Sequence, residues 1–475
     1  MGFFHLSRYI HNLSTWRQSR TCSLWRILRL DSYSLSFGIK KENRMRHRKI
    51  ERPKFGEHLH EFTLDNGLRA WLIQRKGYIH KCALLVFDYG SLYVRFRIDG
   101  RTYETPFGIA HLLEHRLFEK EYGSIFDKFA DYGADANAFT SYSATGYHFD
   151  CTDHFYECLQ LLIRGASNLY LTEDALNKEK EVVICELKES QENPGNLLHR
   201  NLLNALYATH PVKVDIAGTV ESVKNIDCKA MYLAHNIFYR PRNSILVAAG
   251  DIEPKRFIEV VSESSSEWKD NGKSPEIIIP KEPMSAHRHY VRAKTQMARH
   301  KVAVAFKDSF SPSDKTLARR IFAAELASAC TLGHSSEDYQ TLYQEGIIDD
   351  TFSAAYLADR YFGYFVFSCD TDKPRRFVQS VKDVISKRKR EGFKKEEFER
   401  LKKRALGALL ASLDSLSHTV SLLAIGQMFG HLYLDTLKLL TSLTPDNVLS
   451  VLKEVCTEKK CAVSVVSPLS DGKST

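Results

Sequence analysis

The pattern of apolar and polar residues predicts a first half that mixes strands and helices. Residues 62–64 and 68–73 are rich in strand formers, and the Asn66-Gly67 pair between them is the dipeptide that tight hairpin turns prefer. Gly133 ends a helical pattern that starts near Ser124. Further strands are expected at 82–87, along 134–151 and at 244–249, and further helices after 106–108, through most of 154–206 and near 227–237.

The second half repeats this order of elements after a polar stretch. Residues 263–284 are rich in Ser, Lys, Gly and Pro and are typical of a linker. We expect strands at 302–306, within 351–369 and at 461–466, and helices at 314–330, 374–389, 395–430 and after 444–446. Both halves end with a helix followed by an apolar strand. The sequence therefore predicts an α+β fold of two homologous lobes, each a mostly antiparallel sheet covered by helices, at 55–262 and 285–475.

The positive charge of the chain is concentrated at its N-terminus. The net charge is +9, but residues 1–54 contain 13 Lys+Arg and 3 Asp+Glu, which leaves 54 basic and 55 acidic residues in the rest. A neutral body does not indicate a nucleic-acid groove. We interpret 1–54 as a basic extension outside the folded lobes, with Met45 as the preferred start. The alternative is an organelle transit peptide, because residues 1–30 hold five Arg and no acid.

Cysteine usage and hydropathy narrow the expected location. The ten Cys are scattered without a Cys-x-x-Cys pair, which suits a reducing compartment, and no stretch of eighteen apolar residues predicts a membrane span. We expect a cytoplasmic protein, or an organelle-matrix protein if the basic leader is a transit peptide.

The segment with the clearest chemistry is Gly-Ile-Ala-His-Leu-Leu-Glu-His at 108–115. On a helix, His111 and His115 lie one turn apart, so both imidazoles can bind one ion, and Glu114 lies beside them. Zinc binds two His and a carboxylate in catalytic sites and leaves one position open to water, whose proton a neighbouring carboxylate accepts. His-x-x-Glu-His is the inverted form of the common zinc-peptidase motif. A surface helix with two unrelated His would give the same five residues by chance.

A third ligand is expected on the helix near 174–192. There Leu176, Val183 and two carboxylates, Glu179 and Glu186, fall along one face. Buried carboxylates need a cation or donors, although a solvated helix face would hold the same residues at no cost. Together with the upstream motif, we interpret Glu186 as the third zinc ligand and Glu179 as the carboxylate that orients a histidine or assists proton transfer.

These segments together resemble the pitrilysin/insulysin (insulinase-like) family of metallopeptidases, and within it the short, processing-peptidase-like bacterial members. The matching text is residues 108–115, 133–140 (Gly-Ala-Asp-Ala-Asn-Ala-Phe-Thr), 179–186 and 210–219, in the order and spacing of the family. The resemblance implies that His111, His115 and Glu186 bind Zn2+, that Glu114 is the general base and that Glu179 supports it. It also implies that Asn137, Ala138 and Thr140 lie on a strand along which an extended peptide substrate binds.

The resemblance weakens at one point of the second half. Family members usually contribute an Arg and a Tyr from this lobe to the substrate carbonyl, and neither is in place in 342–350. We therefore expect a heterodimer in which a homologous partner subunit supplies Arg and Tyr, as in members encoded as pairs. The expected function is a zinc metalloendopeptidase that hydrolyses short or unfolded peptides. The alternatives are a non-catalytic scaffold subunit and a zinc hydrolase acting on another substrate.

Overall fold

The first lobe is built on an eight-stranded sheet whose last edge is the strand β10. The computed structural model describes residues 35–36, 46–52, 57–270, 272–310, 316–428 and 433–469. In spatial order the sheet consists of β1 (Leu35–Ser36), β2 (Arg46–Arg52), β3 (Glu57–Thr63), β4 (Arg69–Gln74), β12 (Ser244–Gly250), β5 (Lys81–Phe87), β11 (Thr145–Cys151) and β10 (Asp135–Thr140). All neighbours are antiparallel except β4 and β12, which are parallel.

The second lobe repeats the inner part of this sheet. Its five strands are, in spatial order, β14 (Tyr290–Thr295), β18 (Cys461–Pro468), β15 (His300–Asp308), β17 (Gly363–Thr371) and β16 (Ser353–Ala358). Here β14 and β18 are the parallel pair, at the place that β4 and β12 occupy in the first sheet. The last strand of each half thus inserts between two strands that follow one another in the chain, β4 and β5 in the first half and β14 and β15 in the second, which confirms the prediction of two homologous α+β lobes.

Helices follow these strands in a matching order in both halves. The first half contains α2 (Ile109–Leu117), α3 (Ile125–Asp131), α4 (Phe155–Ser167), α5 (Glu173–Glu192), α6 (Pro194–Leu206), α7 (Val220–Lys224), α8 (Cys228–Phe238) and α9 (Pro254–Ser264). The second half contains α10 (Leu317–Leu332), α11 (Glu337–Gln344), α12 (Pro374–Glu391), α13 (Lys395–Ser412), α14 (Leu416–Met428), α15 (Tyr433–Ser442) and α16 (Pro445–Val455).

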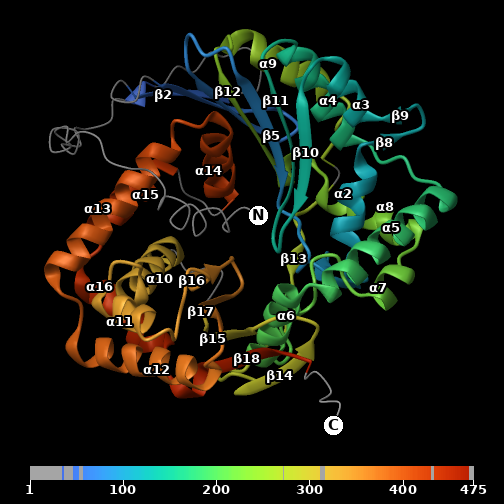
Figure 1. The fold of residues 1–475 in the computed structure, drawn as a ribbon. Coiled ribbons are helices and arrows are strands. Elements are labelled where there is room, and N and C mark those ends of the chain that lie inside the picture. The colour runs from blue at the N-terminus through green and yellow to red at the C-terminus, as the bar shows by residue number, and fades with distance from the viewer. Residues whose placement is uncertain are drawn as a thin grey trace.

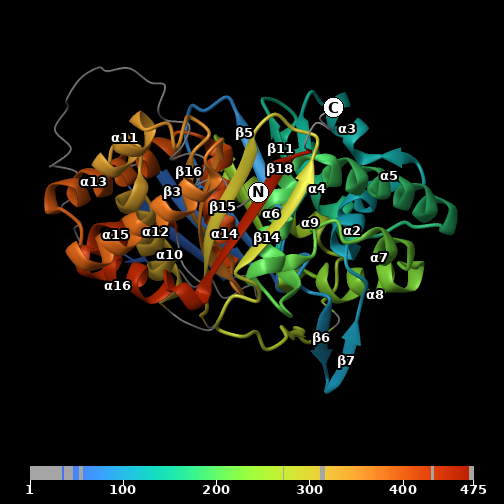
Figure 2. The same cartoon turned by 60° about the horizontal axis from the view of Figure 1, so that its bottom comes forward.

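Short elements complete the described structure. The strands β6 (Arg95–Ile98) and β7 (Arg101–Glu104) form a hairpin that projects from the body of the molecule in Figure 2, and β13 (Glu276–Ile277) pairs with β6. The strands β8 (Glu119–Lys120) and β9 (Gly123–Ser124) connect α2 to α3. Single 3₁₀ turns lie at Pro211–Lys213, Pro241–Asn243 and Glu458–Lys460.

Each lobe covers one face of the other lobe's sheet with a helix. The helix α6, from the first half of the chain, packs on β14, β18 and β15, and α14, from the second half, packs on β12 and β5 (Figure 1). Leu416, Val420, Leu423 and Ala424 of α14 are buried in one cluster with first-lobe strand residues such as Val86 and Val247. This reciprocal exchange buries one face of each sheet against a helix from the other half of the chain.

Two of the expected elements are divided in the structure. The strand expected along 134–151 is a hairpin, β10 and β11, because the chain turns where Ser141 and Ala144 bond to each other. The helix expected over 395–430 breaks into α13 and α14 at Leu413–Ser415, where the Ser415 hydroxyl accepts from the backbone of His418. The alternation of apolar and polar residues continues through the turn between β10 and β11, and the apolar spacing continues across the break between α13 and α14. The sequence pattern therefore showed neither division.

The expected segment boundaries also shift. Arg46–Arg52 pairs along its length with β3, so part of the range expected as an extension, 1–54, belongs to the first sheet. Within the expected linker 263–284, Glu276–Ile277 pairs with β6 and so adds to the first lobe. Residues 1–34 lie outside the described residues.

In the described part of the chain, no single helix is long and apolar enough to cross a membrane. Only α13 and α14 taken together have that length and composition, and a bend of 110° separates them.

Candidate metal centre

The helix with the His-x-x-Glu-His motif, α2, begins where the backbone around Gly108 passes very close to the backbone around Gly218. Gly108 caps α2 with a positive φ of 88°, and a Cβ at this position would lie 2.4 Å from the Ala217 carbonyl oxygen. Gly218 also has a positive φ, and a Cβ there would lie 2.6 Å from the Phe107 carbonyl oxygen. Only glycine permits this approach without strain. The segment around 210–219 therefore fixes where α2 begins.

The second helix of the site, α5, packs against α2 and carries both predicted carboxylates. Its N-terminus is capped by the Thr172 hydroxyl, which accepts from the backbone of Ala175 at 3.2 Å. Leu176, Val183 and Leu187 anchor the helix in the first core. This leaves Glu179 and Glu186 on the neighbouring part of the helix surface, seven residues and about two turns apart.

The structure brings the motif residues together at one point. Ligand atoms of His111, Glu114 and His115 lie within 4.8 Å of one another, and the two imidazole rings are 4.5 Å apart. This is the only group of three or more His, Cys, Asp or Glu at such spacing among the described residues. Glu186 is outside this tight group, but its Oε2 lies 3.8 Å from Nε2 of His115. The donor set of two imidazoles and nearby carboxylates suits Zn2+.

Glu179 determines which nitrogen of His115 is available to a metal ion. Its Oε1 lies 2.9 Å from Nδ1 of His115, and its Oε2 lies 3.5 Å from a guanidinium nitrogen of Arg116. The hydrogen bond from His115 lowers the pKa of Glu179, so the carboxylate stays ionised and can only accept. Nδ1 of His115 therefore donates this bond, and Nε2, the other ring nitrogen, faces Glu186 at 3.8 Å. Metal-binding histidines are commonly oriented in this way.

Burial and neighbouring charges shift the pKa values of the two motif histidines in opposite directions. Burial alone would lower the pKa of His115, but Glu179, Glu114 and Glu186 raise it above its usual value. Burial lowers the pKa of His111 to about 4, so this ring is neutral and able to bind metal at neutral pH. Its Nδ1 is buried and has no hydrogen-bond partner among the described residues.

Glu114 is placed as a proton acceptor beside this group. Burial raises its pKa, against the opposing effects of His115 and of a hydrogen bond from Thr140, whose hydroxyl donates to Oε2 at 3.1 Å. A carboxylate with a raised pKa exchanges protons more readily near neutral pH. Sequence reasoning did not predict this contact between Glu114 and Thr140, because no pattern indicated that the end of β10 meets the end of α2.

The three predicted substrate-binding residues all lie on the edge strand β10, but on two faces of it. Thr140 and Ala138 share the face that packs against α2, whereas Asn137 pairs with His148 on the opposite face. Among the described strands β10 pairs with β11 alone, so its other side is open to an added strand. Binding of a peptide along this edge stays a prediction.

The stretch without the expected Arg and Tyr lies at the end of α11 and in the turn after it. Asp349 there pairs with Arg299, at 2.7 Å, and accepts from Thr351, so its carboxylate is engaged within the second lobe. Cys185, which adjoins Glu186 in the sequence, is exposed.

Comparison with known proteins gives consistent matches. The family model described as "Insulinase (Peptidase family M16)" matches residues 91–220, and the one described as "Peptidase M16 inactive domain" matches 225–405. The chain is 30% identical over 427 residues to "Uncharacterized zinc protease YmfH" of Bacillus subtilis, which spans 89% of this chain and 99% of that protein. A putative M16-like peptidase from Alicyclobacillus acidocaldarius superposes with a TM-score of 0.83 at 29% identity, over 88% of this chain and 99% of its own.

Proposed function

Because the chain belongs to the insulinase family of M16 peptidases, we propose that it is a zinc-dependent endopeptidase that hydrolyses short or unfolded peptides. The observation that supports this most is the convergence of His111, Glu114 and His115 within 4.8 Å, with His115 oriented by Glu179. A scaffold protein has no need of an ionised carboxylate that fixes a histidine tautomer beside a second histidine and a buried acid.

In this proposal His111, His115 and Glu186 would hold Zn2+, which would supply Lewis-acid chemistry to the scissile carbonyl and to a water molecule. Glu114 takes the proton from the attacking water and returns it to the departing amine. Thr140 keeps the Glu114 carboxylate in place through its 3.1 Å hydrogen bond. An extended peptide binds along the open edge of β10, which leads directly to Thr140.

The second half of the chain favours a partner subunit. Residues 342–350 contain no Arg, so the expected pair of an Arg and a Tyr seven residues apart is not in place, and Asp349 is paired within its own lobe. We infer that the group which stabilises the developing oxyanion comes from a homologous chain in a heterodimer. A non-catalytic scaffold subunit would also lack this pair of residues. The family model that matches 225–405 is described as an "inactive domain", which is equally consistent with that alternative.

The test is zinc content and cleavage of a quenched peptide by the full chain, alone and mixed with a candidate homologous partner. Glu114→Gln should keep zinc and the fold and lose activity by on the order of 100-fold or more. His111→Ala and Glu186→Ala should lose zinc itself. Stoichiometric zinc with no cleavage, either by the chain alone or by the mixture with the partner, would favour the scaffold alternative. Near-normal cleavage by Glu114→Gln would rule out its role as general base.

A further inference from the structure

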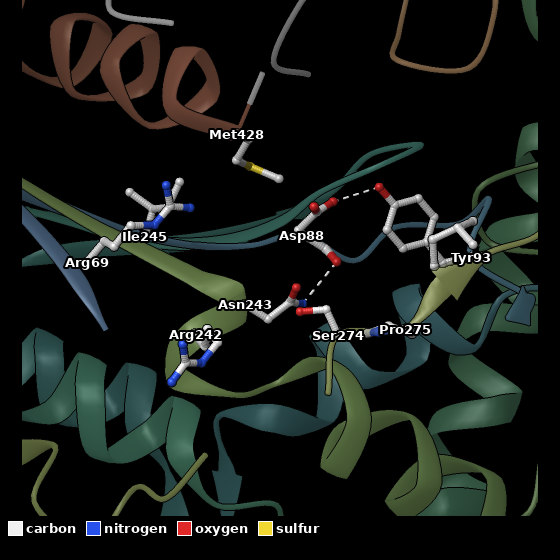
Figure 3. A pocket seen from close by; sticks show the side chains of 10 residues that line it. Arg69, Asp88, Tyr93, Arg242, Asn243, Ile245, Ser274, Pro275 and Met428 are labelled. Atoms are coloured by element: carbon white, nitrogen blue, oxygen red, sulfur yellow. Dashed lines mark hydrogen bonds between the residues drawn. The ribbon is translucent and has the colours of Figure 1, made fainter. Parts of the chain in front are cut away.

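A polar cavity lies at the junction of the two lobes, away from the metal centre. Its volume is about 210 Å³, and it is bounded by the starts of β4 and β12, the residue after β5, the segment around Ser274 and the last residue of α14. Figure 3 shows Arg69 and Arg242 on one side, Asp88 and Tyr93 on the other, and Met428 above them. The occupant of this cavity would contact residues from both halves of the chain.

The charges around the cavity are satisfied except at Arg69. Asp88 accepts from the Tyr93 hydroxyl at 2.6 Å and from Arg360 at 2.9 Å and 3.1 Å, and Arg242 donates to Asp270 at 2.6 Å. Arg69 is half-buried and has no hydrogen bond or ion pair within the described ranges of the chain. Burial lowers its pKa, although Glu61 and Asp88 oppose this. A half-buried cation without a partner costs free energy that a bound anion would recover.

The shape and chemistry of the cavity limit what this anion can be. A cavity of about 150 Å³ is enough to hold benzene, so this one accommodates a somewhat larger molecule. The Met428 side chain provides an apolar contact beside the guanidinium, and Ile245 lies buried behind it. Asp88 would repel a doubly charged phosphate, whereas a carboxylate has a single charge and two oxygens that match the fork of one Arg.

We propose that this cavity binds a small organic carboxylate with a short apolar body, with the carboxylate paired to Arg69 and the hydrocarbon against Met428. The site is separate from the metal centre. Arg69 lies on the same cross-strand row as Ile245, Val86, Gly146 and Phe139, which places it four strand spacings, or roughly 19 Å, from the strand that carries Thr140. A ligand here would therefore stabilise the contact between the lobes without occupying the cleavage site.

The test is calorimetric titration of the full chain with 4-methylpentanoate, its neutral amide and inorganic phosphate. We expect the acid to bind with a Kd of about 1 mM or tighter, and the amide and phosphate at least about tenfold more weakly. Arg69→Gln should weaken binding of the acid by at least about tenfold. Arg375→Gln is the matched control, because Arg375 is exposed on α12 in the second lobe, and it should bind the acid as the wild type does.

A second variant keeps the test decisive if Arg69→Gln does not fold. Ser274 is exposed on a segment outside the sheets, so Ser274→Trp should fill the cavity, leave the melting temperature unchanged and abolish binding. Equal binding of acid and amide, unchanged binding by Arg69→Gln or Ser274→Trp, or no binding of the acid to the wild type would each overturn the proposal. The readout is binding, so it does not depend on peptidase activity.

Discussion

Replacing Glu179 with glutamine should weaken zinc binding although it removes none of the proposed ligands. In the wild type the ionised carboxylate can only accept, which fixes the proton on Nδ1 of His115 and leaves Nε2 free. Glutamine offers both a carbonyl and an amide group. It also brings an amide donor towards Arg116, which already contacts the second oxygen at 3.5 Å. The histidine is therefore less firmly held in the tautomer that binds metal.

The expected magnitude follows from the geometry. The bond is short, at 2.9 Å, and the side chains of His115 and Glu179 are 20% and 18% exposed, so solvent screens it little. Loss of such an orienting partner typically costs 10–100-fold in metal affinity, or about 1.4–2.7 kcal/mol. We expect the upper half of this range, because the amide must also face a buried guanidinium.

Proton competition has to be separated from this effect in the assay. Glu179 helps to raise the pKa of His115, so its loss also makes His115 easier to deprotonate, which favours metal at low pH. Zinc affinity should therefore be measured by chelator competition at a pH of about 8, where competition from protons is smallest, and again near pH 6. The defect of Glu179→Gln should be larger at the higher pH.

Glu181→Gln provides the matched control on the same helix. Glu181 is exposed and has no hydrogen bond or ion pair in the described structure, so this variant should bind zinc as the wild type does. Circular dichroism should show that both variants retain the fold. Zinc affinity of Glu179→Gln within twofold of the wild type at both pH values would refute the orienting role.

Two further predictions concern the joining of the lobes. Leu423→Ala in α14 removes a fully buried side chain from the shared core and should lower the free energy of unfolding by about 3 kcal/mol in urea titrations, in a single transition for both lobes. Burial raises the pKa of Asp359 to about 6, so the folded chain keeps a proton that the unfolded chain loses above about pH 4. The free energy of unfolding therefore falls as the pH rises from about 4 to about 6. Asp359→Asn should therefore match the wild type below about pH 4 and exceed it by up to about 3 kcal/mol at pH 7, whereas parallel urea midpoints across this range would contradict the assignment.

The sequence predicted those parts of the site that depend on spacing along one helix. His111 and His115 converge because residues four apart share a helix face, and Glu179 and Glu186 lie on one side of α5 for the same reason. Contacts between elements were not predictable in this way. That Thr140 donates to Glu114 depends on where the end of an edge strand meets a helix, and the cavity at Arg69 depends on where α14 ends.

The exchange of α6 and α14 shows the same limit at the level of the fold. The apolar residues of α14 predict that the helix is buried, but they do not identify the sheet that it covers, because either sheet offers a suitable apolar face. The order of strands and helices could be predicted from periodicity. Which helix packs on which sheet is decided by the connections between elements, and these leave no local pattern.

The exchange also explains how a lobe without proposed catalytic residues can contribute to the site. Asn193 is both the C-cap of α5 and the N-cap of α6, so no flexible linker separates the helix that carries Glu179 and Glu186 from the helix that packs on the second sheet. The start of α6 is fixed there by Ser464, whose hydroxyl donates to the carbonyl of Leu198, and its end by Lys307, which donates to the carbonyl of Leu206. A shift of the second sheet would therefore move α5 against α2. The position of Glu186 relative to His115 is consequently a property of both lobes, although both residues belong to the first.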